Sequence, residues 1–410
     1  MIRSAIFFFL LGSNLIGRTV SIEDFLLSSE QDIRVAAQRD IIGSISSSDE
    51  STPFINNIQL RTRTNDFDIT EQRYSMIFKF KGIGESSAQK AVQASYIDKH
   101  VYRGDLYFCD AVYERYKTVL RYIYLKRNRD SVTEIGKILN DRYNVLIGRV
   151  ETTGFRISDL LDTKRQVIEN ERDLIRVNNN ISELERRIIE LSGSKSINFD
   201  EDDLISIEDI SDFVSLINVD EEIHQNYYVK ESLIRTQYSE NLYNYEVGRN
   251  RRYFDFFEIG FDTGKWNKEY DRPFDNFRQS FYIELGFNLP FIKSDMHSLL
   301  RRRSGVIENR LDFMYLTENL KSEAANLSND LHSLYRHRDM IMGHSIRELA
   351  ESSYSDYINM EGTDPLIILD IKENKVRTRR MLEEIENSIR MAYCEILHLF
   401  GKHDLNLMVR

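Results

Sequence analysis

Two segments, GFRISDLLDTK from Gly154 to Lys164 and GTDPLIILDIK from Gly362 to Lys372, decide the fold of this chain. They share few letters: a Gly, and then Leu-Asp-x-Lys. Their surroundings repeat much more fully, because each segment opens a heptad-patterned helix, and that helix follows a long polar helix and a pair of short alternating strands. An internal repeat of this kind determines architecture. The sequence therefore predicts strand, strand, long helix, turn and helix, twice over.

The predicted repeats divide the chain near its middle. The first covers residues 18–195, with strands near 57–66 and 73–81 and a helical hairpin over 85–192. The second covers residues 196–410, with strands near 251–262 and 278–289 and a hairpin over 291–402. We also expect helices over about 21–45 and 220–248, and a linker around Ser192–Ser196.

The strands alternate between apolar and polar residues. In the last strand, Phe281, Ile283, Leu285 and Phe287 alternate with polar residues or Gly. This period is typical of transmembrane barrel strands, which face lipid on one side and water on the other. An ordinary antiparallel sheet with one buried face has the same alternation. Four strands do not close a barrel, and open edges do not occur in lipid, so a barrel would need strands from several copies.

The helices carry coiled-coil seams. In the first hairpin one apolar series recurs every seven residues, and a second follows three positions behind: Val167, Leu174, Ile181 and Ile188, then Val177, Leu184 and Leu191. An unbroken helix from Glu85 to Val150 would be roughly 100 Å long at 1.5 Å per residue. A compact domain with a small sheet has no use for helices of this length. They favour a hollow cylinder of packed helices continuing from a shared barrel.

Composition narrows the function classes. The 410 residues carry a net charge of −11, which argues against a nucleic-acid partner. The basic run Arg301-Arg302-Arg303 is interpreted as a solvated face. Cys109 and Cys394 are expected to pack as small buried groups. No cofactor or metal site is expected, because no Cys or His cluster, dinucleotide loop or nucleophile motif is present.

The N-terminal segment has the pattern of a secretory signal. A basic start at Arg3 precedes the apolar run from Ile6 to Leu11, and residues 1–17 are assigned to the signal. The run is too short to span a bilayer as a helix. A buried N-terminal helix is the alternative interpretation.

In this order of elements the chain resembles TolC-type outer membrane efflux proteins. The resemblance covers nearly the whole chain after the signal and rests on the duplicated order, Pro290, the Gly362-Thr363 and Leu369-Asp370 segment, and Phe400-Gly401. It implies a mainly α homotrimer with a 12-stranded β-barrel and a periplasmic α-helical barrel. It further implies a passive exit duct in the outer membrane lipid, without catalytic residues or cofactors. The implied partners are a periplasmic adaptor (membrane fusion) protein and an inner-membrane pump, in efflux or type I secretion.

The resemblance also assigns candidate residues. The hairpin tips and periplasmic gate would include Gly154, Asp159, Asp162, Gly362 and Asp370, and the strand exits would be Gly82, Gly84 and Pro290. The chain departs from the family at Ile367, where the family has an Asp. It departs again at Asp364 and Pro365, where the family has a basic residue. Helix N-terminal acids are also favoured by the helix dipole, so a structural role competes with the gate role.

Two alternatives to a duct remain open. An enzyme has no support in the motifs. A periplasmic coiled-coil scaffold or adaptor would explain the heptads without a membrane, but it does not explain why alternating strands precede each long helix. Detergent dependence distinguishes a scaffold from a duct.

Overall fold

The computed structural model describes residues 19–46, 54–64, 72–151, 155–216, 218–263, 280–288, 296–344 and 364–410. The signal segment, Gly154, Pro290 and Gly362 lie outside these residues. The chain forms two compact units. Unit 1 comprises residues 1–36, 105–226 and 318–410, and unit 2 comprises residues 37–104 and 227–317.

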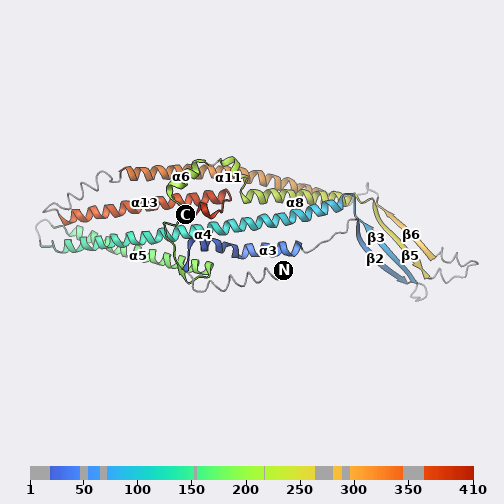
Figure 1. The fold of residues 1–410 in the computed structure, drawn as a ribbon, viewed down its shortest axis with the longest axis horizontal. Helices are drawn as coiled ribbons and strands as arrows, with labels where there is room; N and C mark the ends of the chain where they lie inside the picture. The colour runs from blue at the N-terminus through green and yellow to red at the C-terminus, as the bar shows by residue number, and fades with distance from the viewer. Residues whose placement is uncertain are drawn as a thin grey trace, which may run out of the picture. The chain divides into compact units, whose positions relative to one another are not determined.

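Unit 2 contains a four-stranded antiparallel sheet, visible in Figure 1 as four adjacent arrows. Its strands are β2 (Ile55–Thr64), β3 (Gln72–Phe80), β5 (Phe254–Asp262) and β6 (Phe281–Phe287), in the order β2-β3-β5-β6. The four predicted strands are therefore present, with bounds within a few residues of those expected. The central pair, β3 and β5, joins the two sequence repeats directly.

Helices continue from the sheet within unit 2. They are α8 (Tyr227–Asn250), the first part of α4 (Glu85–Ile147), the first part of α11 (Met296–His344) and the second part of α3 (Ile33–Ser46). Polar contacts join α8 to α11: the Asn309 amide donates to Ser239 Oγ at 2.5 Å, and Arg310 pairs with Glu240 at 2.7 Å. On α4, buried His100 contacts Gln38 of α3 through Nδ1 at 2.7 Å. Burial and nearby Arg103 and Lys99 lower the pKa of His100.

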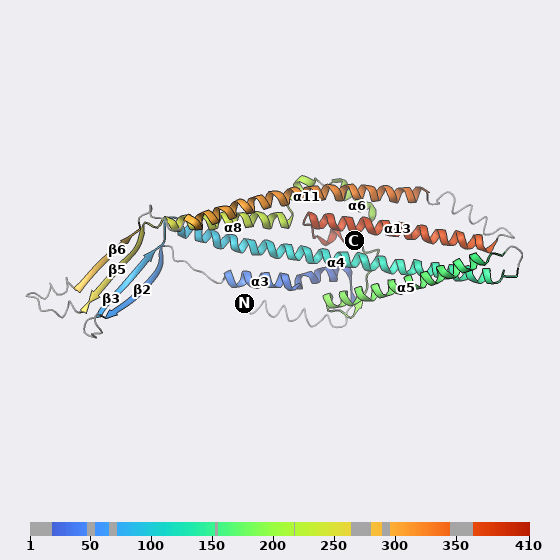
Figure 2. The same cartoon turned by 180° about the vertical axis from the view of Figure 1, so that it is seen from behind.

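Unit 1 is helical around the remainder of α4, α5 (Ile157–Ser192) and α13 (Pro365–Leu399), which lie side by side in Figures 1 and 2. The predicted seam of α5 is buried at Val177, Ile181, Leu184 and Ile188. Leu191 is 39% exposed instead, because Gly193 in the left-handed region (φ 67°) ends the helix two residues later. One core cluster joins α4 to α13 through Ile135, Ile138, Leu139, Leu369 and Val376.

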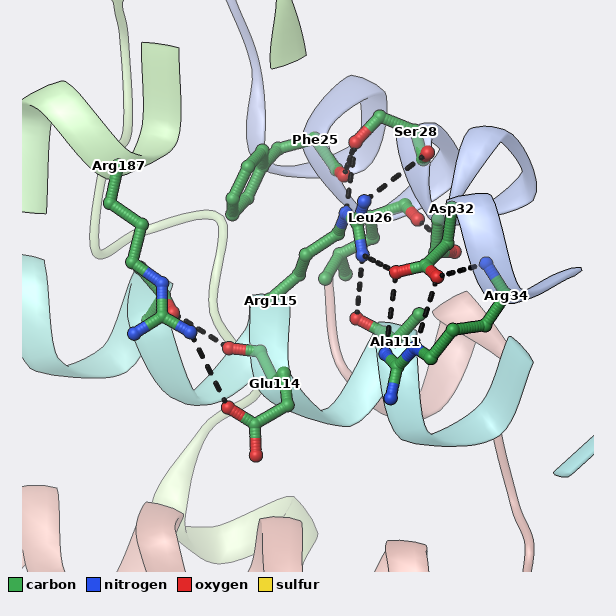
Figure 3. A network of polar contacts seen from close by, with 11 residues as sticks. Phe25, Leu26, Ser28, Asp32, Arg34, Ala111, Glu114, Arg115 and Arg187 are labelled. Carbon is green, nitrogen blue, oxygen red and sulfur yellow. Dashed lines mark hydrogen bonds and ion pairs between the residues drawn. The ribbon is translucent and has the colours of Figure 1, made fainter. Parts of the chain in front are cut away.

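The expectation of one helix over residues 21–45 is wrong. The chain forms α2 (Ile22–Leu27), a 3₁₀ turn η1 (Ser28–Gln31) and α3. The hydroxyls of Ser28 and Ser29 donate to Phe25 O and Leu26 O, each at 2.6 Å, and such local bonds compete with helix propagation. Figure 3 shows what holds the break: buried Arg115 of α4 donates to Ser28 Oγ at 3.0 Å and approaches Asp32 at 3.9 Å.

The expected linker is also structured. In it, β4 (Ser196–Ile197) pairs in parallel with β1 (Thr19–Val20). The helix expected over 220–248 is divided into α7 (Val219–Ile223) and α8, and α6 (Ile207–Leu216) precedes them. The C-terminal turn η2 (Leu405–Leu407) is held by Tyr393, whose hydroxyl donates to Leu407 O at 2.9 Å. Among the helices that the structure describes, none has a stretch long and apolar enough to cross a membrane.

Candidate functional site

One face of the sheet is apolar across all four strands and exposed. The register places Leu60, Met76, Ile259 and Ile283 in a single cross-strand row. The rows on either side place Ile58 with Phe78, Phe257 and Leu285, and Thr62 with Tyr74, Phe261 and Phe281. Leu60 and Ile283 are 77% and 68% exposed. A continuous exposed apolar surface of this kind marks a contact with lipid or with another protein.

The opposite face is polar and internally bonded. Arg73 pairs with Asp262 at 3.3 Å and stacks over the ring of Tyr282 at 4.8 Å, and the Tyr282 hydroxyl donates to Glu258 at 2.9 Å. Among the strands that the structure describes, the outer strands β2 and β6 each pair on one side only. The sheet therefore has an apolar face, a polar face and two open edges.

A bulge explains why the apolar pattern of β5 is interrupted in the sequence. Between Phe254 and Phe256 the register against β6 shifts by one residue, which places Asp255 off the regular alternation. Beyond this point Phe257, Ile259 and Phe261 return to the apolar face. The extra residue in a β-bulge changes which side chains point to each face of the sheet, and the strand continues beyond it.

An aromatic row crosses the end of the sheet that leads into the helices. Phe54 and Phe80 have ring centroids 5.2 Å apart, Phe80 and Phe254 are 4.9 Å apart, and Phe254 and Phe287 are 5.3 Å apart. Phe54 and Phe287 are 62% and 65% exposed. Rings at such distances attract one another, so the row connects all four strands.

The predicted exits Gly82 and Gly84 lie where β3 passes into α4. Gly84 adopts φ 79°, which L side chains rarely adopt. A Cβ on Gly82 would lie 2.1 Å from the carbonyl oxygen of Gly248 on α8. The Gly82 amide also donates to buried Glu85 at 2.6 Å, and Arg252 pairs with that carboxylate at 3.2 Å. The glycines therefore let α4 and α8 approach closely at the strand exits.

At the hairpin tips, the end of α4 meets the start of α13. Arg149, just beyond α4, makes a bidentate pair with Asp364: Nη1 donates to Oδ2 at 3.0 Å and Nη2 to Oδ1 at 2.6 Å. Asp364 also caps α13 by accepting from the Leu366 amide at 2.9 Å, with Pro365 as the first helical residue. Arg149 and the Leu366 amide lower the pKa of Asp364, because both stabilise the carboxylate.

Asp370 joins a second group of ion pairs nearly two turns further along. It contacts Arg142 of α4, which also pairs with buried Glu373 at 2.8 Å. Arg377 pairs with Glu373 at 2.6 Å from the next turn of α13. Asp370 remains 61% exposed at its side chain. The predicted gate acid is thus balanced by a cation of the same chain.

Asp159 and Asp162, the candidate acids of the first repeat, interact with neighbours on their own helix. Ser158 donates to Asp159 at 3.2 Å, and Asp162 lies 3.5 Å from Arg165 on the same helix. Both acids are exposed. These local partners fit the dipole role of acids in a first helical turn.

Several site residues escaped the sequence analysis. Arg142, Arg149 and Gly248 belong to no motif, and their partners lie far away in the chain. Glu85 carried a weak signal, since a Glu three residues after a helix-capping position returns a bond to the cap amide. In the described part of the chain, no group of three His, Cys, Asp or Glu is arranged to hold a metal ion.

Several solved structures share this arrangement of strands and helices. VceC from Vibrio cholerae, an outer membrane protein, superposes with a TM-score of 0.66 over 93% of this chain and 96% of its own, at 12% identity. The fold is TolC-like. The open MtrE outer membrane channel of Neisseria gonorrhoeae has a TM-score of 0.63 over 93% of this chain and 88% of its own, at 9% identity.

A third channel supports the same fold. The Campylobacter jejuni CmeC outer membrane channel has a TM-score of 0.57 over 94% of this chain and 83% of its own, at 12% identity. No protein-family model and no curated protein matches the sequence. At these identities the likeness establishes the TolC-like fold, and the activity needs a separate argument.

Proposed function

We propose that this chain is the outer membrane exit duct of a tripartite efflux or type I secretion system. In this proposal three copies form a 12-stranded β-barrel in the outer membrane and an α-helical barrel in the periplasm. The duct is passive and needs no catalytic residue or cofactor. Solutes or polypeptides leave through it, driven by an inner-membrane pump that a periplasmic adaptor couples to the duct.

The sheet is the observation that carries the proposal. Within the part of the chain that the structure describes, no element covers its apolar face, and Leu60 and Ile283 remain largely exposed. Its open edges on β2 and β6 would be unsatisfied in lipid. Strand addition from further copies satisfies both edges and directs the apolar face outward. The polar face, with Arg73, Asp262 and Glu258, would then line the water-filled lumen.

The tip ion pairs suggest how the periplasmic end is held closed. Arg149–Asp364 and Arg142–Asp370 fasten the end of α4 to the start of α13. We propose that opening separates these helix ends, with Gly154 and Gly362 in the turns that meet the adaptor. Asp159 and Asp162 would then add negative charge at the entrance, which favours cations.

Membrane fractionation followed by mass determination in detergent tests the proposal. A duct should be found in the outer membrane fraction, require detergent, and have three times the mass of the protomer without its signal, which is slightly below the 48.5 kDa of the full chain. Reconstituted into a planar bilayer, it should show single-channel conductance. A monomer or dimer that is soluble without detergent would exclude the barrel and favour the scaffold alternative.

A further inference from the structure

A group of arginines lies where the sheet of unit 2 passes into its helices. Arg251 follows α8 directly, and Arg301, Arg302 and Arg303 lie in the second turn of α11. All four are exposed. In the part of the chain that the structure describes, none of the four takes part in an ion pair, whereas nearby Arg252 pairs with Glu85. We call the four residues the arginine collar.

The helix contacts place the collar near the sheet. Ser298 of α11 donates to Glu246 of α8 at 3.0 Å, and Asn309 donates to Ser239. Residues 301–303 therefore lie alongside the last two turns of α8. At 1.5 Å per residue this is within roughly 10 Å of the end of that helix, where the chain enters β5. An extended arginine side chain covers much of that distance.

The collar also borders a groove between α8 and α11. The groove has a volume of about 440 Å³, and Arg301 and Arg302 line it together with Ser239, Ser304 and Asn309. Glu308 is the acid on its wall, and it accepts from Ser304 at 3.1 Å. The hydroxyls of Ser239 and Ser304 already donate to Arg235 O and Glu308, so the guanidinium groups of Arg301 and Arg302 are the donors that the groove offers to a ligand. Guanidinium groups recognise phosphate through paired N–H donors.

The surfaces beside the collar indicate where the phosphate comes from. The aromatic row (Phe54, Phe80, Phe254 and Phe287) crosses the same end of the sheet, and the exposed apolar face continues beyond it. Apolar face, aromatic row and arginines follow one another in the order of hydrocarbon, interface and anionic headgroups. Arg301, Arg302 and Arg303 are also consecutive in the chain, so three cations lie within one helical turn.

We propose that the arginine collar binds the phosphate groups of anionic phospholipids in the periplasm-facing leaflet of the outer membrane. The inference rests on the proposed function, because it requires the sheet to be in a bilayer. It replaces the interpretation of Arg301-Arg302-Arg303 as a merely solvated face. The bound headgroups set the depth of the sheet in the membrane.

Spin-labelled lipids test the collar in the full-length protein. The protein is reconstituted into phosphatidylcholine vesicles containing some phosphatidylglycerol, and electron paramagnetic resonance measures how strongly each labelled lipid associates with it. We expect a preference of roughly 3-fold for phosphatidylglycerol over phosphatidylcholine at low salt, decreasing at high salt. Substitution of Arg301→Gln, Arg302→Gln and Arg303→Gln together should bring the ratio close to one.

The matched control removes the same charge elsewhere. Arg156→Gln, Arg172→Gln and Arg186→Gln together change three exposed arginines that have no ion pair among the described residues, and the preference should persist. Lysine at positions 301–303 should retain most of the preference. If the glutamine variant does not fold, the salt dependence of the wild type still decides.

Three outcomes would overturn the inference. Equal association of both lipids with an inserted wild type would show that the collar is solvated, and the duct would stand. Loss of the preference with inorganic phosphate, but not with chloride at equal ionic strength, would indicate a site for free phosphate. Failure of the wild type to resist alkaline extraction from the vesicles would instead contradict the proposed function itself.

Discussion

The apolar seam of α5 and the apolar face of the sheet follow the same rule of regular hydrophobic spacing, but they have different surroundings. Ile181 and Ile188 are 5% and 0% exposed, whereas Leu60 and Ile283 are 77% and 68% exposed. The seam is completed by other helices of the same chain. The sheet face has no such cover among the described residues. The helical unit is therefore stabilised within the chain, whereas under the proposed function the sheet is stabilised by lipid and by further copies.

The largest expected effect comes from a charge on the apolar sheet face. Ile283→Arg should abolish membrane insertion, because Arg at the bilayer midplane costs roughly 2–4 kcal/mol and a trimer contains three copies. Detergent-free fractionation and trimer mass measure the result. Glu284→Arg, on the opposite face of the same strand, is the control and should still insert. Normal insertion of Ile283→Arg would contradict a lipid-facing sheet.

Shortening the buried helix seam should have the next largest effect. Ile188→Ala leaves a cavity at a fully buried position and should lower the free energy of unfolding by about 2–5 kcal/mol. Chemical denaturation followed by circular dichroism measures it. Ile175→Ala, at a position 62% exposed on the same helix, should change unfolding by under about 0.5 kcal/mol. Equal losses would mean that another copy covers Ile175.

A methyl group at Gly82 tests the junction between the sheet and the helices that follow it. Gly82→Ala should lower the unfolding free energy by about 1–3 kcal/mol, because the new Cβ would meet Gly248 O at 2.1 Å. Thermal unfolding in detergent measures it. Gly43→Ala, on α3, should be neutral or stabilising by about 0.5–1 kcal/mol, because the new Cβ would meet none of the described residues within 4 Å. If Gly82→Ala unfolds at the same temperature as the wild type, the backbone at this junction can shift at little cost in free energy.

The smallest effect concerns pH at the hairpin tip. The pKa of Asp364 lies below its ordinary value of 3.8 in the folded protein. Its pairing therefore stabilises the fold fully above that value and is lost as the pH falls through the lower, folded value. Melting temperatures of wild type and Asp364→Asn should differ at neutral pH, begin to converge as the pH falls below 3.8, and become equal below the lowered pKa of the folded protein.

Asp162→Asn is the matched control for this titration. Its carboxylate is exposed, and among the described residues its ion-pair partner is Arg165 on its own helix, so the substitution should leave the tip contacts between α4 and α13 unchanged. A difference between wild type and Asp364→Asn that persists at the lowest pH would assign the effect to the helix cap geometry and not to the charge.

Much of the fold was predictable because the period of the apolar residues reports the type of secondary structure. The period of two in β6 and the period of seven in α5 identified strands and helices before any contact was known. The break between Ser28 and Asp32 was missed, because it depends on buried Arg115, far along the chain. The bulge at Phe254–Phe256 was visible only as an interruption by Asp255.

The site was less predictable than the fold. Gly82 and Gly84 were identified as strand exits, but their partner Gly248 was not, because close backbone approach leaves no spacing signal. Asp364 was noted as a departure from the family pattern. In the structure Asp364 caps α13 and pairs with Arg149, which lies just beyond α4. The acid is therefore at the position where the family has a basic residue, and the cation is on the neighbouring hairpin.

The sequence by itself determined the duplicated order of elements, the alternation of the strands and the heptad seam, because these are properties of local spacing along the chain. The tertiary structure alone decided that β3 pairs with β5, that Arg149 meets Asp364, and that residues 301–303 of α11 lie alongside α8. These arrangements join residues far apart in sequence, and pairwise contacts of that kind depend on how the elements pack and not on the period within any one of them.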